Sequence, residues 1–335
     1  MDNLVHIGGA KVHKKSSTLA INGTKSLFLS LASLIFLLTC GQTIAAAGFA
    51  GLNDDAGRTV ALSAPAVRIV CLSEAHAENI VAIRAFKQLA GVAFSTDPKW
   101  VNNKIPRLSK NPSKEQIISM QPDMVLFETE WAQKNKPLLK ELDAAKISYA
   151  VISRPKWGRF GTYLEKLGSI CGRPRDASKA QISLERSLQK AKLMADNLLG
   201  RRPRVFVVAG ADFSSCASDS WGARLIEAVG GISAAGSDCQ RITRDPQFVF
   251  YGPQKLALTG KDIDVIITLT GNTRGVPAVS RGAIMKDARF KDIPAVKNGR
   301  VWEMKEDDLM LPSLIRLDSS LAACFKYLMP VKNKK

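Results

Sequence analysis

The sequence predicts an α/β protein in which two parallel-sheet βα lobes are joined by one long backbone helix, with a ligand cleft between the lobes. Three observations predict this fold class. Apolar residues recur at spacings of three and four over 176–199, and Gly200 ends that helical pattern. Short apolar runs alternate with helical patterns before this segment, and the alternation restarts after it. A crossover helix inside one doubly wound sheet is the alternative interpretation.

Four parts follow from this pattern. We expect an export signal and cleavage region at 1–47, an N-terminal α/β lobe at 48–172, a connecting helix at 173–202 and a C-terminal α/β lobe at 203–335. Within the connecting helix, Asp176 is the expected N-cap. A helix over 176–199 would be roughly 35 Å long, which is about the width of a small domain.

The first 47 residues are typical of an export signal. Lysines precede the apolar run 27–38, which is too short to span a bilayer comfortably. Two cleavage sites compete. Leu37 to Cys40 resembles a lipobox, which would leave a protein anchored through a lipid on Cys40, whereas Ala45-x-Ala47 would leave a soluble protein that starts near Gly48. We prefer the soluble form, and both place the protein in the periplasm or another extracytoplasmic space.

The composition excludes a disordered chain, since 46% of the residues are hydrophobic and 23% are charged. The formal net charge of +18 includes four lysines and one aspartate of the first 47 residues, so it falls to about +15 without them. This balance weakly favours an anionic ligand. The basic residues are spread along the chain without an RNP, zinc-finger or basic-helix pattern, so we predict no nucleic-acid partner.

The N-terminal lobe begins with a polar lead-in at 51–65 that suits a small hairpin or an edge strand. The expected strands are 67–72, 89–93, 124–127 and 148–152, and the expected helices are 74–86, 113–120, 131–145 and 159–171. The strands are continuous apolar runs, as in a parallel sheet buried on both faces. Ser113 opens its short helix with Gln116 three residues on, and Gln121-Pro122-Asp123 ends it.

The C-terminal lobe repeats this order. Its expected strands are 204–208, 264–269 and 300–304, and its expected helices are 221–229, 253–258, 283–290 and 314–328. Gly230-Gly231 closes the first of these helices. The two lobes therefore share an architecture without a residue-level repeat.

Five segments between about Asp55 and Met329 resemble the class III periplasmic substrate-binding proteins, which are the cobalamin, ferric siderophore and haem receptors of ABC importers. The segments are DDAGRTV, RIVCLSEAHAENIVAI, IPRLSKNPSKEQIISMQPDMVLF, SWGARLIEAVGG and FKDIPAVKNGRVWEM. The resemblance implies a monomeric binding protein whose partners are a small-molecule metal chelate and an inner-membrane ABC permease. Family members often have glycine where Arg84 and Ser109 stand, and a small residue in place of Glu74, so the ligand stays open.

Ligands of open α/β sheets gather at the carboxyl ends of the strands, and several side chains of the predicted cleft fall in those loops. His76 would contact the ligand and is the one candidate metal ligand, unless it is bonded to backbone at its helix start. Large rings suit flat ligands such as corrin, porphyrin or catecholate. The aromatic candidates are Trp100, Trp131, Trp157, Trp221 and Tyr251. Arg274 is the best placed cation, ahead of Arg154, Arg244 and Arg281.

Two carboxylates match the family's permease-docking positions, namely Glu115 in PSKEQII and Glu227 in RLIEAVGG. Simple helix-dipole complementarity is the alternative role for Glu115. Among the cysteines, Cys216 and Cys239 are the candidate disulfide pair, with buried free thiols as the alternative.

No catalytic motif is present, so we predict a binding protein without a cofactor rather than an enzyme. A ferric siderophore is the leading ligand, with cobalamin or haem next. The competing classes are an exported enzyme that acts in the same cleft and an adhesion or scaffolding protein without a small ligand.

Overall fold

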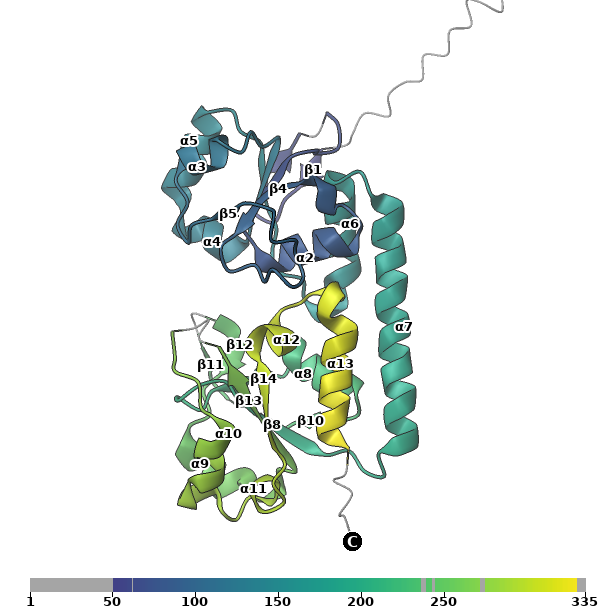
Figure 1. The fold of residues 1–335 in the computed structure, drawn as a ribbon, viewed down its shortest axis with the longest axis vertical. Coiled ribbons are helices and arrows are strands. Elements are labelled where there is room, and N and C mark those ends of the chain that lie inside the picture. The colour runs from purple at the N-terminus through teal and green to yellow at the C-terminus, as the bar shows by residue number, and fades with distance from the viewer. Residues whose placement is uncertain (1–50, 62, 236–238, 243–244, 272–274, 330–335) are drawn as a thin grey trace, which may run out of the picture. The chain divides into compact units, whose positions relative to one another are not determined.

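The structure is a computed structural model that describes residues 51–61, 63–235, 239–242, 245–271 and 275–329 (Figure 1). The chain divides into two compact units, 1–48 and 49–335, and every described residue belongs to the second. The predicted fold class is confirmed. Within this unit the strands form two separate parallel sheets, one before and one after the long helix α7 (Pro174–Leu198).

The N-terminal sheet is parallel throughout and has the strand order β5-β4-β3-β6-β7. Its strands are β3 (Ile69–Cys71), β4 (Leu89–Ala93), β5 (Arg107–Leu108), β6 (Met124–Phe127) and β7 (Tyr149–Val151). Its helices are α2 (Glu74–Ala82), α3 (Lys114–Ile118), α4 (Thr129–Lys134), α5 (Lys136–Ala144) and α6 (Phe160–Ile170), with 3-10 turns at Phe86–Gln88 and Trp157–Arg159. The lead-in forms the expected hairpin of β1 (Leu52–Asn53) and β2 (Thr59–Val60).

Alternate residues of the N-terminal strands enter two different cores, as period-two geometry requires. Cys71 and Leu126 pack into the core that contains the apolar side chains of α2 and α6. Their neighbours Val70 and Val125 pack into the core beneath α3 and α5. Helices therefore cover both faces, which explains why the strands are apolar without alternation.

The C-terminal sheet is also parallel, with the order β10-β8-β13-β14. Its strands are β8 (Arg204–Val208), β10 (Ile232–Ser233), β13 (Val265–Thr270) and β14 (Val301–Lys305). Its helices are α8 (Trp221–Ala228), α9 (Pro253–Thr259), α10 (Arg281–Lys286), α11 (Pro294–Lys297), α12 (Glu306–Met310) and α13 (Leu314–Leu328), with 3-10 turns at Gly260–Asp262 and Ala288–Phe290.

A small antiparallel sheet in this lobe was not predicted from the sequence. It contains β9 (Ser215–Cys216), β11 (Arg241–Ile242) and β12 (Asp245–Val249), in the order β11-β12-β9. Strands of two to five residues with mixed polarity carry no clear periodic signal, which is why they were missed.

Helix α7 begins two residues earlier than predicted, so Asp176 is not its N-cap. Arg173 is at the N-cap and Pro174 occupies the first turn, where its missing N–H is not needed. Along its length α7 packs on α6 of the N-terminal lobe and on α8 and α13 of the C-terminal lobe (Figure 1). One face of the helix is thus shared between both lobes.

The last helix, α13, also bridges the lobes, because it packs on α2 as well as on α7 and α8. The buried Asn79 amide on α2 donates to the Pro312 carbonyl at 2.8 Å and accepts from the Leu314 N–H at 3.0 Å. Arg316, which is 2% exposed, forms two bonds to the Glu78 carboxylate at 2.8 and 2.6 Å. These contacts, between residues more than 230 positions apart, fix the start of α13 against the N-terminal lobe.

Candidate functional site

The loops at the carboxyl ends of the N-terminal strands bring together a charged cluster. Glu74 follows β3, Glu128 follows β6, and Arg154 lies shortly after β7. Arg154 Nε donates to Glu128 Oε2 at 2.8 Å, and Ser73 Oγ donates to Glu128 Oε1 at 2.5 Å. The ion pair is therefore held by three neighbouring strand ends.

Arg154 also reaches the C-terminal lobe. With the Gln247 amide oriented to satisfy both of its contacts, its oxygen accepts from Arg154 Nη1 at 3.2 Å and its nitrogen donates to the Met310 carbonyl at 3.1 Å. The Arg154 side chain is nonetheless 46% exposed. Arg154 is therefore a partly exposed cation at the interface between the two lobes.

Carboxylates outnumber cations at this place. Burial raises the pKa of Glu128, but the surrounding charges and hydrogen bonds, Arg154 foremost and Ser73 among them, together outweigh burial, and the pKa lies below its usual range. For Glu74 the balance is reversed: burial, reinforced by Asp307 of α12 and by Glu128, outweighs Ser95 and Arg154 and raises its pKa. Burial likewise raises the pKa of Asp307, with Asp308 and Asp97 adding to the effect. Glu74 and Asp307 therefore oppose each other from the two lobes as like charges.

A second cation lies deeper at the same interface. Besides its bonds to Glu78, Arg316 donates to Asp308 Oδ1 at 2.8 Å and lies 3.8 Å from Asp97 Oδ2. The Trp100 ring is 5.6 Å from its guanidinium carbon. Arg316 is thus occupied by carboxylates of both lobes, which leaves Arg154 as the exposed cation of the described cluster.

His76 does not point into the cleft, contrary to the prediction. Its side chain is completely buried, with Nδ1 2.9 Å from the Tyr163 hydroxyl and Nε2 2.9 Å from the Ile152 carbonyl. Burial also lowers the pKa of His76 and favours the neutral ring. Both ring nitrogens are engaged inside the lobe, so neither is available to a ligand in this structure. The described residues contain no group of three or more His, Cys, Asp or Glu side chains suited to a metal ion.

The aromatic candidates pack mainly against protein. The ring centroid of Trp157, in the N-terminal lobe, lies 4.8 Å from that of Trp221, in the C-terminal lobe. Trp221 is 5% exposed. Trp131 stacks on Phe127 with a distance of 5.0 Å between the ring centroids, in the core beneath α3 and α5. The structure brings the Trp157 and Trp221 rings together at the lobe interface but leaves Trp131 outside it.

Tyr251 lies in the C-terminal lobe, where its ring is 4.7 Å from Phe206 and its hydroxyl is 2.8 Å from the Thr259 hydroxyl. Arg281 donates from Nε to the Val301 carbonyl at 2.7 Å, so it supports β14. Arg274, Arg244, Cys40 and the export segment lie outside the described residues.

The predicted disulfide between Cys216 and Cys239 is not formed. Cys216 is a completely buried free thiol in β9 whose sulfur lies 3.4 Å from Met310 Sδ. Cys239 Sγ is 3.4 Å from Lys255 Nζ instead. The β9-β12 pairing holds Cys216 inside the core.

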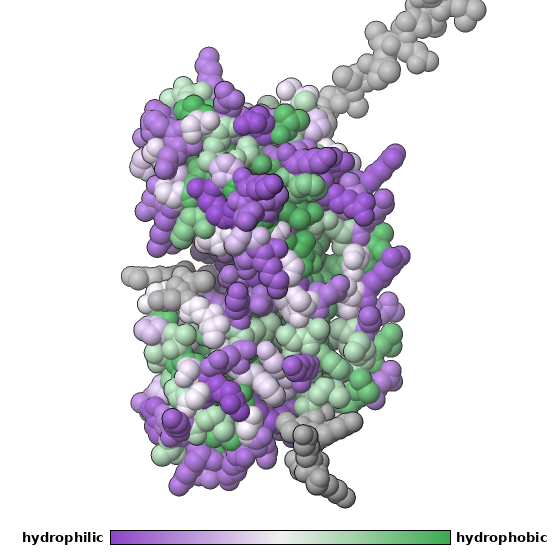
Figure 2. Space-filling view, in the orientation of Figure 1, coloured by the Kyte–Doolittle hydropathy of each residue, from purple (hydrophilic) through white to green (hydrophobic). Residues whose placement is uncertain are grey.

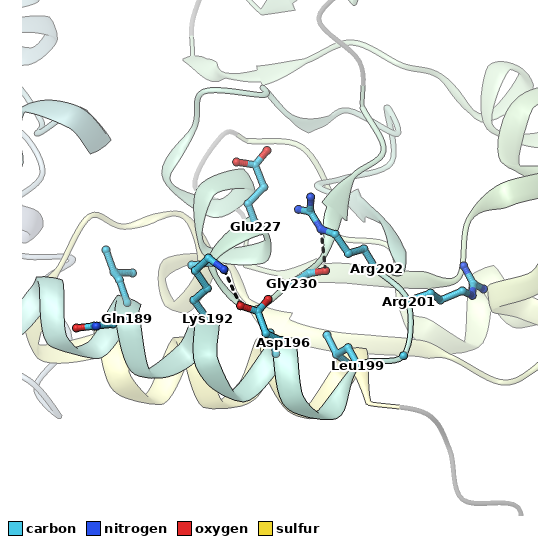
Figure 3. Close-up of a pocket in the computed structure, with 12 residues that line it drawn as sticks. Gln189, Lys192, Asp196, Leu199, Arg201, Arg202, Glu227 and Gly230 are labelled. Carbon is cyan, nitrogen blue, oxygen red and sulfur yellow. Dashed lines mark hydrogen bonds and ion pairs between the residues drawn. The ribbon is translucent and has the colours of Figure 1, made fainter.

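The two proposed docking glutamates occupy different surroundings. The Glu115 side chain is 75% exposed in the first turn of α3. Glu227, on α8, is 35% exposed and accepts from Arg224 Nη1 at 2.8 Å. Glu227 lines a groove of about 670 Å³ between α8 and the end of α7, where Lys192 and Asp196 form part of the other wall (Figure 3).

These helices are also not counterparts in the two lobes. Helix α3 precedes β6, which pairs with β3, the first strand of the N-terminal parallel sheet. In the C-terminal parallel sheet, β13 pairs with the first strand β8 in the same way, and the helix that precedes β13 is α9. Helix α8 follows the first strand, β8, and so corresponds to α2. The C-terminal counterpart of the Glu115 helix therefore carries Gln254 and Lys255 at its start.

Sequence reasoning placed Arg154 among the candidates but missed Glu128, Gln247 and Asp307. A carboxylate directly after a buried strand is a signal that could have found Glu128, because parallel strand ends gather at one edge. Gln247 and Asp307 depend on elements whose positions follow only from tertiary packing.

A family model described as periplasmic binding protein matches residues 69–307. The protein named "Putative ABC transporter substrate-binding lipoprotein YhfQ" of Bacillus subtilis is 25% identical over 198 residues, which cover 58% of this chain and 59% of that protein. The chain thus matches about three fifths of the length of this curated relative. A family of binding proteins agrees with the expectation of a non-enzyme.

Two solved structures share the fold. A possible iron-binding (periplasmic solute-binding) protein of Staphylococcus epidermidis has a TM-score of 0.64 at 17% identity, covering 79% of this chain and 99% of that chain. The periplasmic heme-binding protein RhuT of Roseiflexus sp. RS-1 has a TM-score of 0.62 at 20% identity, covering 78% and 99%. Among the described residues, no helix combines the length and the apolar character needed to cross a membrane.

Proposed function

This chain belongs to the periplasmic binding protein family, and we propose that it is the extracytoplasmic receptor of an ABC importer, which captures an iron chelate beside Arg154 and hands it to the permease. The observation that carries the proposal is the Arg154 cluster, where one exposed cation contacts both lobes. The similarity to a lipoprotein of an ABC transporter and to iron- and heme-binding structures supports it. Haem or cobalamin is the alternative ligand.

The charge of the cleft narrows the class of siderophore. Burial raises the pKa values of Glu74 and Asp307, and repulsion from Asp307 adds to the effect on Glu74 although Arg154 lies nearby. A ligand that is neutral or carries an ammonium group would relieve the repulsion, whereas a ferric catecholate or the two propionates of haem would add to it. We therefore favour a ferric hydroxamate chelate with a cationic arm.

Tryptophan fluorescence tests the ligand, because the Trp157–Trp221 pair spans the two lobes. The full chain is titrated with a cationic ferric hydroxamate, a ferric catecholate, haem and cobalamin. The gallium forms serve as controls for paramagnetic quenching. Saturable quenching by the hydroxamate is expected. Tighter binding of the catecholate or of haem would contradict the proposed class, and no response to any chelate would contradict the receptor role for iron chelates.

A matched pair of variants localises the binding. Glu74→Gln removes one carboxylate from the cleft, and we expect it to weaken hydroxamate binding several-fold. Glu141→Gln makes the same chemical change on the exposed surface of α5 and should leave the affinity unchanged. Equal effects of the two variants would place the ligand elsewhere.

Delivery to the permease is proposed to use Glu115 of α3 together with Glu227 of α8. The protein is proposed to act as a monomer outside the cytoplasm, either soluble after cleavage near Gly48 or anchored through Cys40.

A further inference from the structure

The outward face of α7 carries a regular stripe of basic and aliphatic side chains. We define the basic stripe as six residues at successive spacings of four, three, four, four and three: Arg175, Lys179, Ile182, Arg186, Lys190 and Leu193. Such spacings keep side chains on one face of an α-helix. All six are exposed, and they lie opposite the buried residues Leu184, Ala191 and Ala195 that pack α7 onto the lobes.

The aliphatic members of the stripe are exposed to an unusual degree. Ile182 is 43% exposed and Leu193 is 56% exposed. Four of the ten exposed large hydrophobic side chains of the described residues are on α7, the other two being Met194 and Leu198. Figure 2 shows hydrophobic patches between hydrophilic side chains along this edge of the molecule. One helix therefore holds a large share of the apolar surface.

The four cations of the stripe have no acidic partner in the described part of the chain, where no carboxylate lies within ion-pair distance of them. The three carboxylates of α7 lie to either side of the stripe and are engaged there: Asp176 is 4.0 Å from Arg173, Glu185 accepts from Gln181 at 3.3 Å, and Asp196 accepts from Lys192 at 2.6 Å. The stripe is thus a band of uncompensated positive charge.

We infer that the basic stripe binds the anionic phospholipid surface of a membrane. A helix that presents cations alternating with aliphatic side chains fits a lipid interface, where cations meet headgroup phosphates and aliphatic chains enter the acyl boundary. A nucleic-acid partner would not use the aliphatic members. The stripe faces away from α6, α8 and α13, so α7 can lie on a surface while the Arg154 cluster stays free.

Vesicle sedimentation of the full chain tests this inference, using phosphatidylcholine vesicles with and without phosphatidylglycerol. The stripe variant replaces four cations by glutamine: Arg175→Gln, Lys179→Gln, Arg186→Gln and Lys190→Gln. The control variant makes the same change in charge on exposed lysines of the N-terminal lobe: Lys104→Gln, Lys110→Gln, Lys134→Gln and Lys140→Gln. All preparations share the apolar segment 27–38, so differences between them come from the substituted residues.

Binding of the unaltered protein should require phosphatidylglycerol and weaken with salt. The stripe variant should bind at least about tenfold more weakly, and the control less than about twofold more weakly. Ile182→Gln with Leu193→Gln should weaken binding and make the remainder more sensitive to salt. Equal loss in both charge variants would mean that net charge alone acts, and binding without phosphatidylglycerol would overturn the inference. The inference would also be overturned if the stripe variant kept its vesicle binding but no longer bound the permease or a second copy of the chain.

Discussion

Glu74 shows how one side chain of the cleft is held in an unfavourable state. Burial, with Asp307 and Glu128 nearby, raises its pKa, so the folded protein binds the Glu74 proton more tightly than the unfolded chain does. Stability therefore falls as pH rises from the ordinary carboxyl range, about 4.3, through the raised pKa. At neutral pH the ionised group destabilises the fold.

Removing that charge should stabilise the protein. We expect Glu74→Gln to raise the free energy of unfolding by about 1 kcal/mol at pH 7, because the amide is buried at a smaller cost than the carboxylate. The gain should vanish by about pH 3, where Glu74 is protonated in both states. Urea unfolding at the two pH values measures it. A loss of stability at pH 7 would show that the carboxylate is compensated by a cation.

At the scale of the elements, the contact between α7 and α8 depends on a glycine. Gly230 ends α8 with φ +84°, and a Cβ added there would lie 2.8 Å from the Ala195 Cβ of α7. Only glycine satisfies both the left-handed backbone and the close approach.

The comparison with Gly57 separates the two requirements. Gly57 has φ +80°, but an added Cβ would meet nothing within 4 Å. We expect Gly57→Ala to destabilise the protein by about 1 kcal/mol through backbone strain, and Gly230→Ala by about 3 kcal/mol because overpacking against α7 is added. Urea unfolding measures both. Equal losses would mean that α8 can shift away from α7 without cost.

At the scale of the whole molecule, the docking proposal depends on which surfaces face the permease. Glu115 is 75% exposed, whereas Glu227 is paired with Arg224 beside α7. We expect Glu115→Lys to abolish uptake while chelate affinity is unchanged, and Glu227→Lys to reduce uptake. Transport into permease-containing vesicles measures this, with Glu141→Lys as the control for surface charge. If Glu227→Lys is silent, α9 becomes the C-terminal docking surface, because it is the counterpart of α3.

The whole molecule is also stiffened where α2 meets α13. Glu78 binds Arg316 in the first turn of α13, Asn79 binds Pro312 just before it, and both contacted residues are buried. Breaking such a buried pair is costly, so large rotations of the lobes at this contact are disfavoured. Ligand capture would then involve limited closure around Arg154.

The sequence by itself determined the long strands of the two parallel sheets and most of the helices that cover them. These features depend on local patterns: apolar runs for strands buried on both faces, the Ser113 capping box, and glycine at helix ends. The long helix was predicted to within two residues at its start because its apolar period is regular over its whole length.

Only the tertiary structure decided the character of the cleft. Whether His76 meets a ligand or Tyr163 depends on a neighbour 87 residues away, and Arg154 acquires its partner in the other lobe through β12, a strand with no periodic signal. The net charge of the chain suggested an anionic ligand, yet the residues that meet in the cleft are mostly acidic. A local pattern fixes which face of an element is apolar, but the charge of a site is the sum of side chains that folding brings together from distant positions.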